Sequence, residues 1–359
     1  MKPLTWIKRA ALACAATAAC AGVAAVTSGP ATQPFADPLD TAAVRSPLAA
    51  RALINGLAQA GTRLVAVGQR GHIVYSDDGG AHWSQAAVPL ASDLVAVQFP
   101  TPELGWAVGH DGVVLHSVDG GASWSKQLDG RAAAAIADEQ VSKDPNATDA
   151  QRADAKRMVE QGPDKPFLDV WFEDRNSGYV VGAFNLIFHT ADGGRTWQSW
   201  ADRTDNPSAF HLNAIRAVGG DLYIVGEQGL VLRLNRERGR FEAMATPYKG
   251  TYFGLAGKDG ALLVYGLRGN AYRSTDRGAS WSKVETGLQV GLTASALAQD
   301  GRLLLVSQAG QVLVSADAGA TFTRLPGAPG GPVSTALAAG GQLVLGGVRG
   351  LRQQPLAAH

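Results

Sequence analysis

The stretch Ser76-Asp77-Asp78-Gly79-Gly80-Ala81-His82-Trp83 decides the fold of this chain, because its pattern returns along the sequence. Ser, Thr or Asn is followed two positions later by Asp, two further on by Gly, and then by an aromatic residue. The copies end at positions 83, 124, 197, 241, 281 and 322, the fourth being eroded, so the steps are 41, 73, 44, 40 and 41 residues. A unit of about 40 residues is therefore repeated, with one large insertion.

A second pattern has the same period. A short apolar run ends in a small residue, crosses two variable positions and reaches another turn residue, starting at Gly68, Gly109, Gly182, Gly226, Gly266, Ser307 and Gly346. Glycine makes up 44 of the 359 residues and charged residues only 18%, which favours many short strands joined by tight turns. About 40 residues is the length of one four-stranded blade. We predict an all-β fold, a seven-bladed β-propeller.

Two parts of the chain depart from the repeat. The last unit supplies only three strands, so we expect the segment from Asp40 to Ala49 to pair there and close the ring as an N-terminal strand. The 73-residue step contains two helix-forming stretches. They predict a helical insertion at about residues 130–165, between blades 2 and 3. If the insertion projects as an arm, the side chains of Ile136, Met158 and Val159 should be exposed. If it packs on the propeller, they should be docked.

Residues 1–29 have the layout of a secretory signal peptide, with a basic start and an Ala-rich apolar run. We therefore expect a periplasmic protein in which residues 30–359 form a single propeller. Both cysteines, Cys14 and Cys20, lie in the signal segment, and the sequence before Cys20 is a poor lipoprotein motif, so we expect no lipid anchor there. Loss of this segment leaves 29 basic and 31 acidic residues, a balance that does not attract nucleic acid.

The repeated Asp motif has a structural interpretation. Its carboxylate can accept hydrogen bonds within a tight turn, and its aromatic residue can pack on the adjacent blade. An active site needs its groups once, so repetition argues against catalysis, and we expect no metal or cofactor. The histidines also lack metal-ligand spacing. The predicted structural residues are Asp78, Trp83, Asp119, Trp124, Asp192, Trp197, Asp276, Trp281, Asp317 and Phe322.

These motifs are the Asp-box, or BNR, repeat, and together with the glycine turns they resemble the photosystem II stability and assembly factor family over roughly residues 40–356. The resemblance implies a non-enzymatic chaperone that holds a membrane protein or complex on the periplasmic or lumenal side of a membrane. It also implies an arginine patch on one face. We expect a monomer without a nucleic-acid partner.

Propeller geometry assigns the two motifs to opposite faces. The turns between second and third strands share one face with the links between blades, and the Asp boxes occupy the other. A partner would then meet the variable positions of the glycine turns. The candidate partner-binding residues are Arg70, His110, Asp111, Phe184, Glu227, Arg268, Gln308 and Arg349.

Two alternatives remain. Because sialidases also contain Asp boxes, one alternative is a glycoside hydrolase. However, Asp111 and Glu227 are the only acids at the variable turn positions, and their blades 2 and 4 are not adjacent. Glycosidase carboxyl groups must lie within about 10 Å of each other. The other alternative is a propeller that binds a glycan or small ligand at its central mouth without turnover. Aromatic residues at the mouth would favour it, and the turns offer only Phe184.

Overall fold

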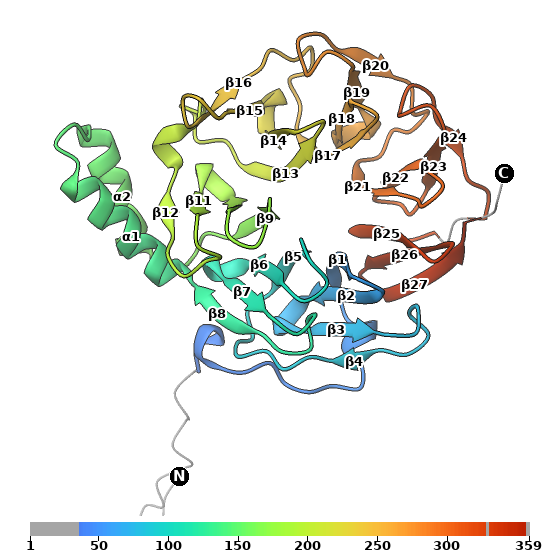
Figure 1. Ribbon diagram of the computed structural model, residues 1–359, viewed down its shortest axis with the longest axis horizontal. Coiled ribbons are helices and arrows are strands. Elements are labelled where there is room, and N and C mark those ends of the chain that lie inside the picture. The colour runs from blue at the N-terminus through green and yellow to red at the C-terminus, as the bar shows by residue number, and fades with distance from the viewer. Residues whose placement is uncertain (1–35, 328–329, 357–359) are drawn as a thin grey trace, which may run out of the picture. The chain divides into compact units, whose positions relative to one another are not determined.

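The computed structural model describes residues 36–327 and 330–356, so the predicted signal peptide lies outside the described residues. From Asp37 onward the chain forms one compact unit. Six four-stranded sheets and one three-stranded sheet, all antiparallel, surround a common axis (Figure 1). The predicted seven-bladed propeller is confirmed.

Each blade takes its strands in chain order from the axis outward. The inner strands are β1 (Ile54–Ala60), β5 (Leu94–Gln98), β9 (Phe167–Phe172), β13 (Leu212–Val218), β17 (Tyr252–Lys258), β21 (Leu292–Leu297) and β25 (Thr335–Ala339). The second strands are β2 (Arg63–Gly68), β6 (Gly105–Gly109), β10 (Gly178–Gly182), β14 (Asp221–Gly226), β18 (Ala261–Gly266), β22 (Leu303–Ser307) and β26 (Gln342–Gly347). The third strands are β3 (Ile73–Ser76), β7 (Val114–Ser117), β11 (Ile187–Thr190), β15 (Val231–Asn235), β19 (Ala271–Ser274), β23 (Val312–Ser315) and β27 (Gly350–Pro355). The outer strands, which blade 7 lacks, are β4 (Ser84–Gln85), β8 (Ser125–Leu128), β12 (Gln198–Ser199), β16 (Arg240–Ala243), β20 (Ser282–Val284) and β24 (Thr323–Arg324).

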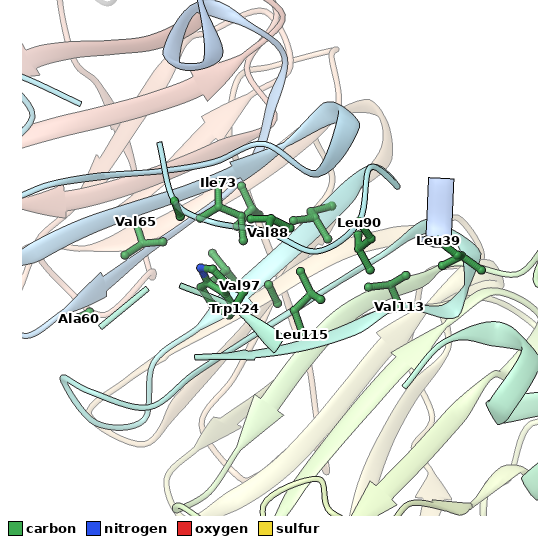
Figure 2. Packing of buried hydrophobic residues seen from close by; sticks show 14 residues of the cluster. Leu39, Ala60, Val65, Ile73, Val88, Leu90, Val97, Val113, Leu115 and Trp124 are labelled. Atoms are coloured by element: carbon green, nitrogen blue, oxygen red, sulfur yellow. The ribbon is translucent and has the colours of Figure 1, made fainter. Parts of the chain in front are cut away.

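The core lies between neighbouring blades. Second strands carry consecutive apolar residues because both faces of each sheet are covered. Figure 2 shows the layer between blades 1 and 2, where Val65 and Ile73 of one blade face Val97 and Leu115 of the next. Trp124, the last residue of an Asp box, fills the same layer. The aromatic residue of each Asp box thus packs toward the preceding blade, as the motif predicts.

Closure of the ring differs from the prediction. The inner strands β1 and β25 pack side by side, but blade 7 has only three strands in the described residues. Residues 40–49 instead run across blade 1, where Gln85 Nε2 donates to Val44 O and Gln85 Oε1 accepts from Ser46 N–H. Leu39 is buried beside Leu90. The expected N-terminal strand is therefore wrong: apolar burial and the Gln85 amide hold the segment away from blade 7.

The helical insertion is confirmed as α1 (Gly130–Lys143) and α2 (Asp149–Gln161). Asp129 caps α1 by accepting from Ala132 N–H, and Thr148 with Gln151 forms a capping box at α2. The hairpin lies outside the ring beside β12 (Figure 1). There Gln140 pairs with the backbone of Ser199 through both its amide nitrogen and its amide oxygen.

The hairpin is docked on the propeller along one side only. Ile136 and Met158 are partly buried against the layer between blades 2 and 3. Val159 is 49% exposed. Of the three residues expected to separate an arm from a packed insertion, two are therefore docked, and the hairpin is part of the folded body.

Candidate binding face

The glycine turns gather on one face, which we call the turn face. The first residue of a turn lies against the start of the inner strand of its own blade, as Gly68 does against Leu53 and Gly226 against His211. The last glycine meets the link to the next blade, as Gly71 does at Leu90. The turns and the links therefore share a face, as propeller geometry predicts.

The tips of five turns have an unusual backbone. Their third residues are not glycine yet adopt left-handed φ values between 54° and 58°, a conformation that is disfavoured for residues with a Cβ atom. Five blades therefore hold a side chain at the same strained position on the turn face. These residues are Arg70, Asp111, Phe184, Gln228 and Arg268.

The three predicted arginines have exposed side chains on this face. Arg70, Arg268 and Arg349 form no ion pair with the described residues. Only the backbone N–H of Arg70 is engaged, donating to Asp93 Oδ1 at 2.7 Å. His110 and Gln308 are likewise exposed. This face therefore presents guanidinium groups that can pair with an anionic partner.

The two acids at the variable turn positions are occupied by neighbouring groups. Ser92 Oγ donates to Asp111 Oδ2 at 2.6 Å. The backbone N–H of His211 donates to Glu227 Oε2 at 2.9 Å, and His211 Nδ1 lies 3.0 Å from the same oxygen. Each carboxylate thus stabilises its own blade, and the structure does not bring the two together as a catalytic pair.

Apolar side chains lie among these polar groups. Phe184 is 59% exposed and rests edge-on against His211. Phe253, Leu267, Val290 and Val348 are also exposed on the turn face. Together they are five of the ten large hydrophobic residues that are exposed in the described chain, so apolar exposure concentrates here. Such exposure is typical of an interaction surface.

Sequence reasoning missed Phe253, although a signal was present. At the equivalent inner-strand position, Asn55 donates to Leu94 O and Asn213 to Tyr252 O in the next blade. Phe253 cannot donate, and its ring instead covers Gly291. Phe253 thus replaces, in blade 5, the asparagine that bridges to the next blade in blades 1 and 4. It also adds a second exposed aromatic to the one that the turns predicted.

The inner strands carry an ion pair that the motifs did not predict. Asp169 of β9 is 5% exposed and pairs with Arg216 of β13, whose side chain is 40% exposed. Asp169 also accepts from the N–H groups of Ile215 and Val170, at 2.8 and 2.9 Å. Burial raises the pKa of Asp169, while the guanidinium and these N–H groups oppose that shift. The pair joins blades 3 and 4.

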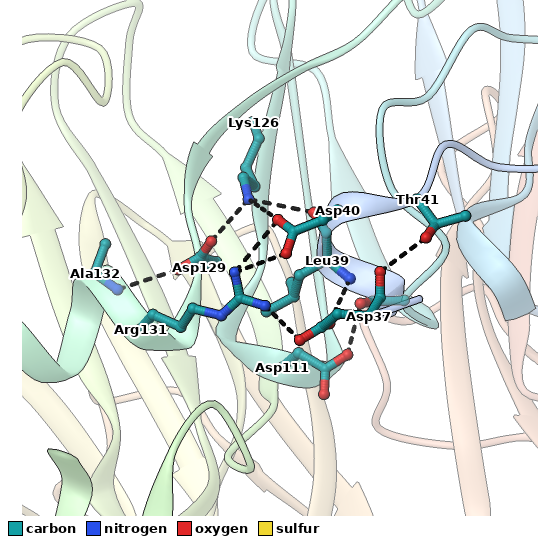
Figure 3. Close-up of polar contacts among 10 residues, drawn as sticks. Asp37, Leu39, Asp40, Thr41, Asp111, Lys126, Asp129, Arg131 and Ala132 are labelled. Carbon is teal, nitrogen blue, oxygen red and sulfur yellow. Dashed lines mark hydrogen bonds and ion pairs between the residues drawn. The ribbon is translucent and has the colours of Figure 1, made fainter. Parts of the chain in front are cut away.

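The start of α1 fixes the N-terminal segment at the edge of the turn face (Figure 3). Arg131 pairs with Asp37 and, at 3.0 Å, with Asp40. The N–H of Leu39 and the Arg131 guanidinium lower the pKa of Asp37. Lys126 joins Asp129 to the carbonyl of Leu39. This cluster connects the N-terminal segment, blade 2 and the insertion.

A groove of about 530 Å³ opens on the outer side of the helical hairpin. Ala134, Asp138 and Ser142 of α1 and Val159 of α2 are among the residues that line it. The groove lies outside the ring rather than on the turn face. Its charged lining residues are Arg131, Asp138 and Glu139.

The Asp boxes occupy the opposite face, beside the turns between first and second strands. Arg63 at one such turn pairs with Asp77 at 2.6 Å and donates to Gly120 O in the next Asp box. Each box aspartate accepts from the hydroxyl two residues before it and from the N–H four residues after it. These aspartates are Asp78, Asp119, Asp192, Asp276 and Asp317.

The donors of an Asp box hold its carboxylate in the ionised form. The Ser280 hydroxyl, the Ser280 N–H and the Ser274 hydroxyl lower the pKa of Asp276 to about 2. The ring nitrogens of Trp83 and Trp124 donate within their own boxes, to Gly80 O and Gly121 O. The carboxylate thus has its partners inside the turn. In the described part of the chain, no cluster of three or more His, Cys, Asp or Glu residues is placed to hold a metal.

Comparison with known proteins identifies the family. The model for the photosynthesis system II assembly factor YCF48 matches residues 59–134 and 148–324. The chain belongs to this family. The gap between the matched ranges covers most of α1 and the loop that leads to α2. The photosystem II assembly lipoprotein Ycf48 of Synechococcus sp. (strain CC9902) is 26% identical over 163 residues, which are 44% of this chain. The chain spans about half the length of that relative, 48%.

Solved structures of the YCF48 family share the fold. A structure described as YCF48 bound to D1 peptide superposes with a TM-score of 0.63 at 18% identity, covering 86% of this chain and 94% of that one. YCF48 from Cyanidioschyzon merolae gives 0.62 at 17% identity, covering 86% and 97%. At these identities the likeness establishes the propeller. Among the described residues no helix is long and apolar enough to cross a membrane.

Proposed function

We propose that this protein is a non-enzymatic assembly factor that holds a segment of a membrane protein against its turn face. The observation that carries the proposal is the combination of Arg70, Arg268 and Arg349, exposed and without ion pairs in the described residues, with exposed apolar side chains on one face. Family membership supports it, and a YCF48 structure holds a D1 peptide. The segment would place acidic groups at the arginines and apolar groups at Phe184 and Phe253.

The turn face argues against the hydrolase alternative. A glycosidase needs one carboxyl group as acid and a second as nucleophile or base at a fixed separation. Asp111 and Glu227 are instead bonded to Ser92 and His211 in separate blades. Release of sugar from sialosides or β-glucans by the purified protein would contradict a non-enzymatic role.

The test is binding by a variant in which Arg70, Arg268 and Arg349 are all changed to Ala. The probes are a D1 peptide and detergent-solubilised membranes of the source organism, with bound proteins identified by mass spectrometry. The control changes Arg195 and Arg238 to Ala, since these exposed arginines lie away from the turn face. We expect the triple variant to lose at least tenfold in affinity and the control less than twofold. Equal binding by both would refute the assignment.

We also propose a periplasmic location, with residues 1–29 removed on export. The layout of that segment supports it. Cell fractionation and amino-terminal sequencing of the mature protein test it together. A protein that keeps residue 1 and partitions with the cytosol would contradict export, while binding through the turn face could still hold.

A further inference from the structure

Blade 7 ends in an open strand. The other six blades place an outer strand beside the third, whereas β27 (Gly350–Pro355) has no neighbour on its outer side in the described residues. The two-residue turn Val348–Arg349 joins Gly347 to Gly350 as facing residues. Because main-chain groups alternate along an antiparallel strand, those of Leu351 and Gln353 point to the open edge. Such an edge is a template for another strand.

The layer beside this blade also lacks the aromatic residue that the other layers have. Trp83, Trp124, Trp197, Phe241, Trp281 and Phe322 each fill one layer between blades. The layer between blades 6 and 7 contains only aliphatic members in the described chain, many of them alanines. Leu356 packs at its margin. Blade 7 therefore lacks both the outer strand and the aromatic side chain that comes before it in the other blades.

Two arginines meet at one end of the open edge. A Cβ atom placed on Gly331 would lie 3.8 Å from Arg352 Nη1 and 3.9 Å from Arg349 Cζ, so the two guanidinium groups are close together. No carboxylate of the described residues pairs with either. Arg352 Nη1 donates to Gly330 O, but its Nε and Nη2 are buried without a partner in the described chain. Two adjacent guanidinium groups with free N–H donors form a favourable binding site for an anionic group such as a carboxylate.

We propose that the outer edge of β27 is a second binding site, which takes an extended segment of a partner polypeptide as the fourth strand of blade 7. The segment runs antiparallel to β27, so its carboxyl end lies beside Arg349 and Arg352 and presents an acidic group there. An aromatic residue near its amino end enters the layer between blades 6 and 7. This inference rests on blade 7 alone and does not depend on the turn face being the site proposed above.

The described chain argues against other occupants. The N-terminal segment leaves blade 7 at Ala49–Arg51, crosses blade 1 and reaches Arg131 beyond blade 2. A second copy pairing edge to edge would bring Arg352 toward its own counterpart, where like charges repel. A partner with an acidic segment has neither difficulty.

The probe is a synthetic peptide of residues 121–129 of this chain, Gly-Ala-Ser-Trp-Ser-Lys-Gln-Leu-Asp, which carries the outer strand of blade 2 with an aromatic residue and a terminal acid. We expect saturable binding that slows hydrogen exchange at Leu351 and Gln353. Replacing Trp by Ala or the final Asp by Asn in the peptide should weaken binding at least fivefold. The R70A/R268A variant should bind it as well as the unchanged protein does.

Protein variants locate the site. Gln353→Pro removes one outward N–H, whereas Gln353→Ala keeps it. We expect at least tenfold weaker binding for Gln353→Pro and for Arg352→Glu, and less than twofold for Gln353→Ala. A further variant carries an extra copy of residues 315–326, an Asp box with its outer strand, after Leu356. This extension should raise the melting temperature and abolish peptide binding, and it keeps the test valid if Gln353→Pro does not fold.

Three results would overturn the proposal. One is peptide binding that is unchanged in a folded Gln353→Pro variant, or an unchanged melting temperature in the variant extended by residues 315–326. Another is slow exchange at Leu351 and Gln353 in the free protein that becomes fast when the chain begins at Asp37, which would make the N-terminal segment the occupant. The third is a concentration-dependent dimer that Arg352→Glu strengthens.

Discussion

The ion pair between Asp169 and Arg216 should contribute unequally to stability through its two partners. Asp169 occupies the position after the bulge of its inner strand, where the other bulged blades place only glycine or alanine, such as Ala96 and Ala214. The fold therefore accepts a small residue there. The charge, rather than the space, determines the cost of substitution.

Arg216→Met leaves a carboxylate that is 5% exposed without its cation, which costs about 3–5 kcal/mol. Asp169→Ala leaves an arginine that is 40% exposed and can turn to water, and it removes the carboxylate acceptor of the Ile215 and Val170 N–H groups. We expect this variant to cost less, about 2–3 kcal/mol. The double variant leaves the same N–H groups unpaired but no isolated carboxylate, so it should cost about as much as Asp169→Ala, about 2–3 kcal/mol.

Thermal unfolding followed by circular dichroism measures these differences. For a chain of this length 1 kcal/mol corresponds to roughly 2 °C in Tm. The expected losses are therefore about 6–10 °C for Arg216→Met, and about 4–6 °C for both Asp169→Ala and the double variant. A matched control is Arg233→Met, because the Arg233 side chain is half-buried and forms no ion pair in the described chain. A double variant that is less stable than Arg216→Met would show that the unpaired carboxylate is not the source of the loss.

Three further predictions concern turns and docking. Asp276 has a folded pKa of about 2, below the value of about 4 in an unfolded chain, so its contribution is present above pH 4 and is lost as the pH falls toward 2. The Tm advantage of the unchanged protein over Asp276→Asn should shrink across that range, and an advantage constant with pH would contradict this. Gly71 and Gly79 both have positive φ, but a Cβ on Gly71 would lie 2.2 Å from Leu90 O whereas Gly79 has open space. Urea unfolding should show Gly71→Ala losing about 2–4 kcal/mol and Gly79→Ala about 1, and equal losses would exclude the clash as the cause. Gln140→Ala removes both bonds to Ser199 and should speed hydrogen exchange in α1 about tenfold, a net loss of about 1–2 kcal/mol; Glu139→Ala is the control, and identical exchange in both would rule out this docking contact.

The fold was predictable because the same turn motif occurs in six of the seven blades and each copy indicates the same local structure. One Asp box predicts a turn, but its return every 40 residues or so predicts a blade. The insertion was predictable for the converse reason, since helix-forming residues interrupt a strand period. The repeat period does not predict where a segment outside the repeat packs. Residues 40–49 could pair with blade 7 by their length, yet Leu39 and Gln85 hold them on blade 1.

The site was predictable in position more than in composition. Strand order alone places the glycine turns on one face, so Arg70, Arg268 and Arg349 could be found from the sequence. Phe253 and Asp169 could not, because each lies inside a strand where an apolar or acidic residue has an ordinary structural explanation. The register of the strands shows which positions are equivalent between blades, and it is there that the two residues differ from their counterparts. An aromatic residue replaces asparagine at one, and an aspartate replaces alanine at the other.

The segments added to the repeat, and the strand missing from it, lie in one part of the ring. Blade 7 lacks a strand, the N-terminal segment crosses blade 1, the Arg131 cluster lies at blade 2 and the hairpin docks on blade 3. Blades 4 to 6 keep the regular four strands. These additions and this gap are not needed for a blade that only completes a ring, and they bring both proposed sites into one sector. Arg349 lies in that sector and belongs to both the turn face and the open edge. One partner chain could therefore reach both sites, and a short connection between two weak contacts gives strong binding without either contact being strong alone.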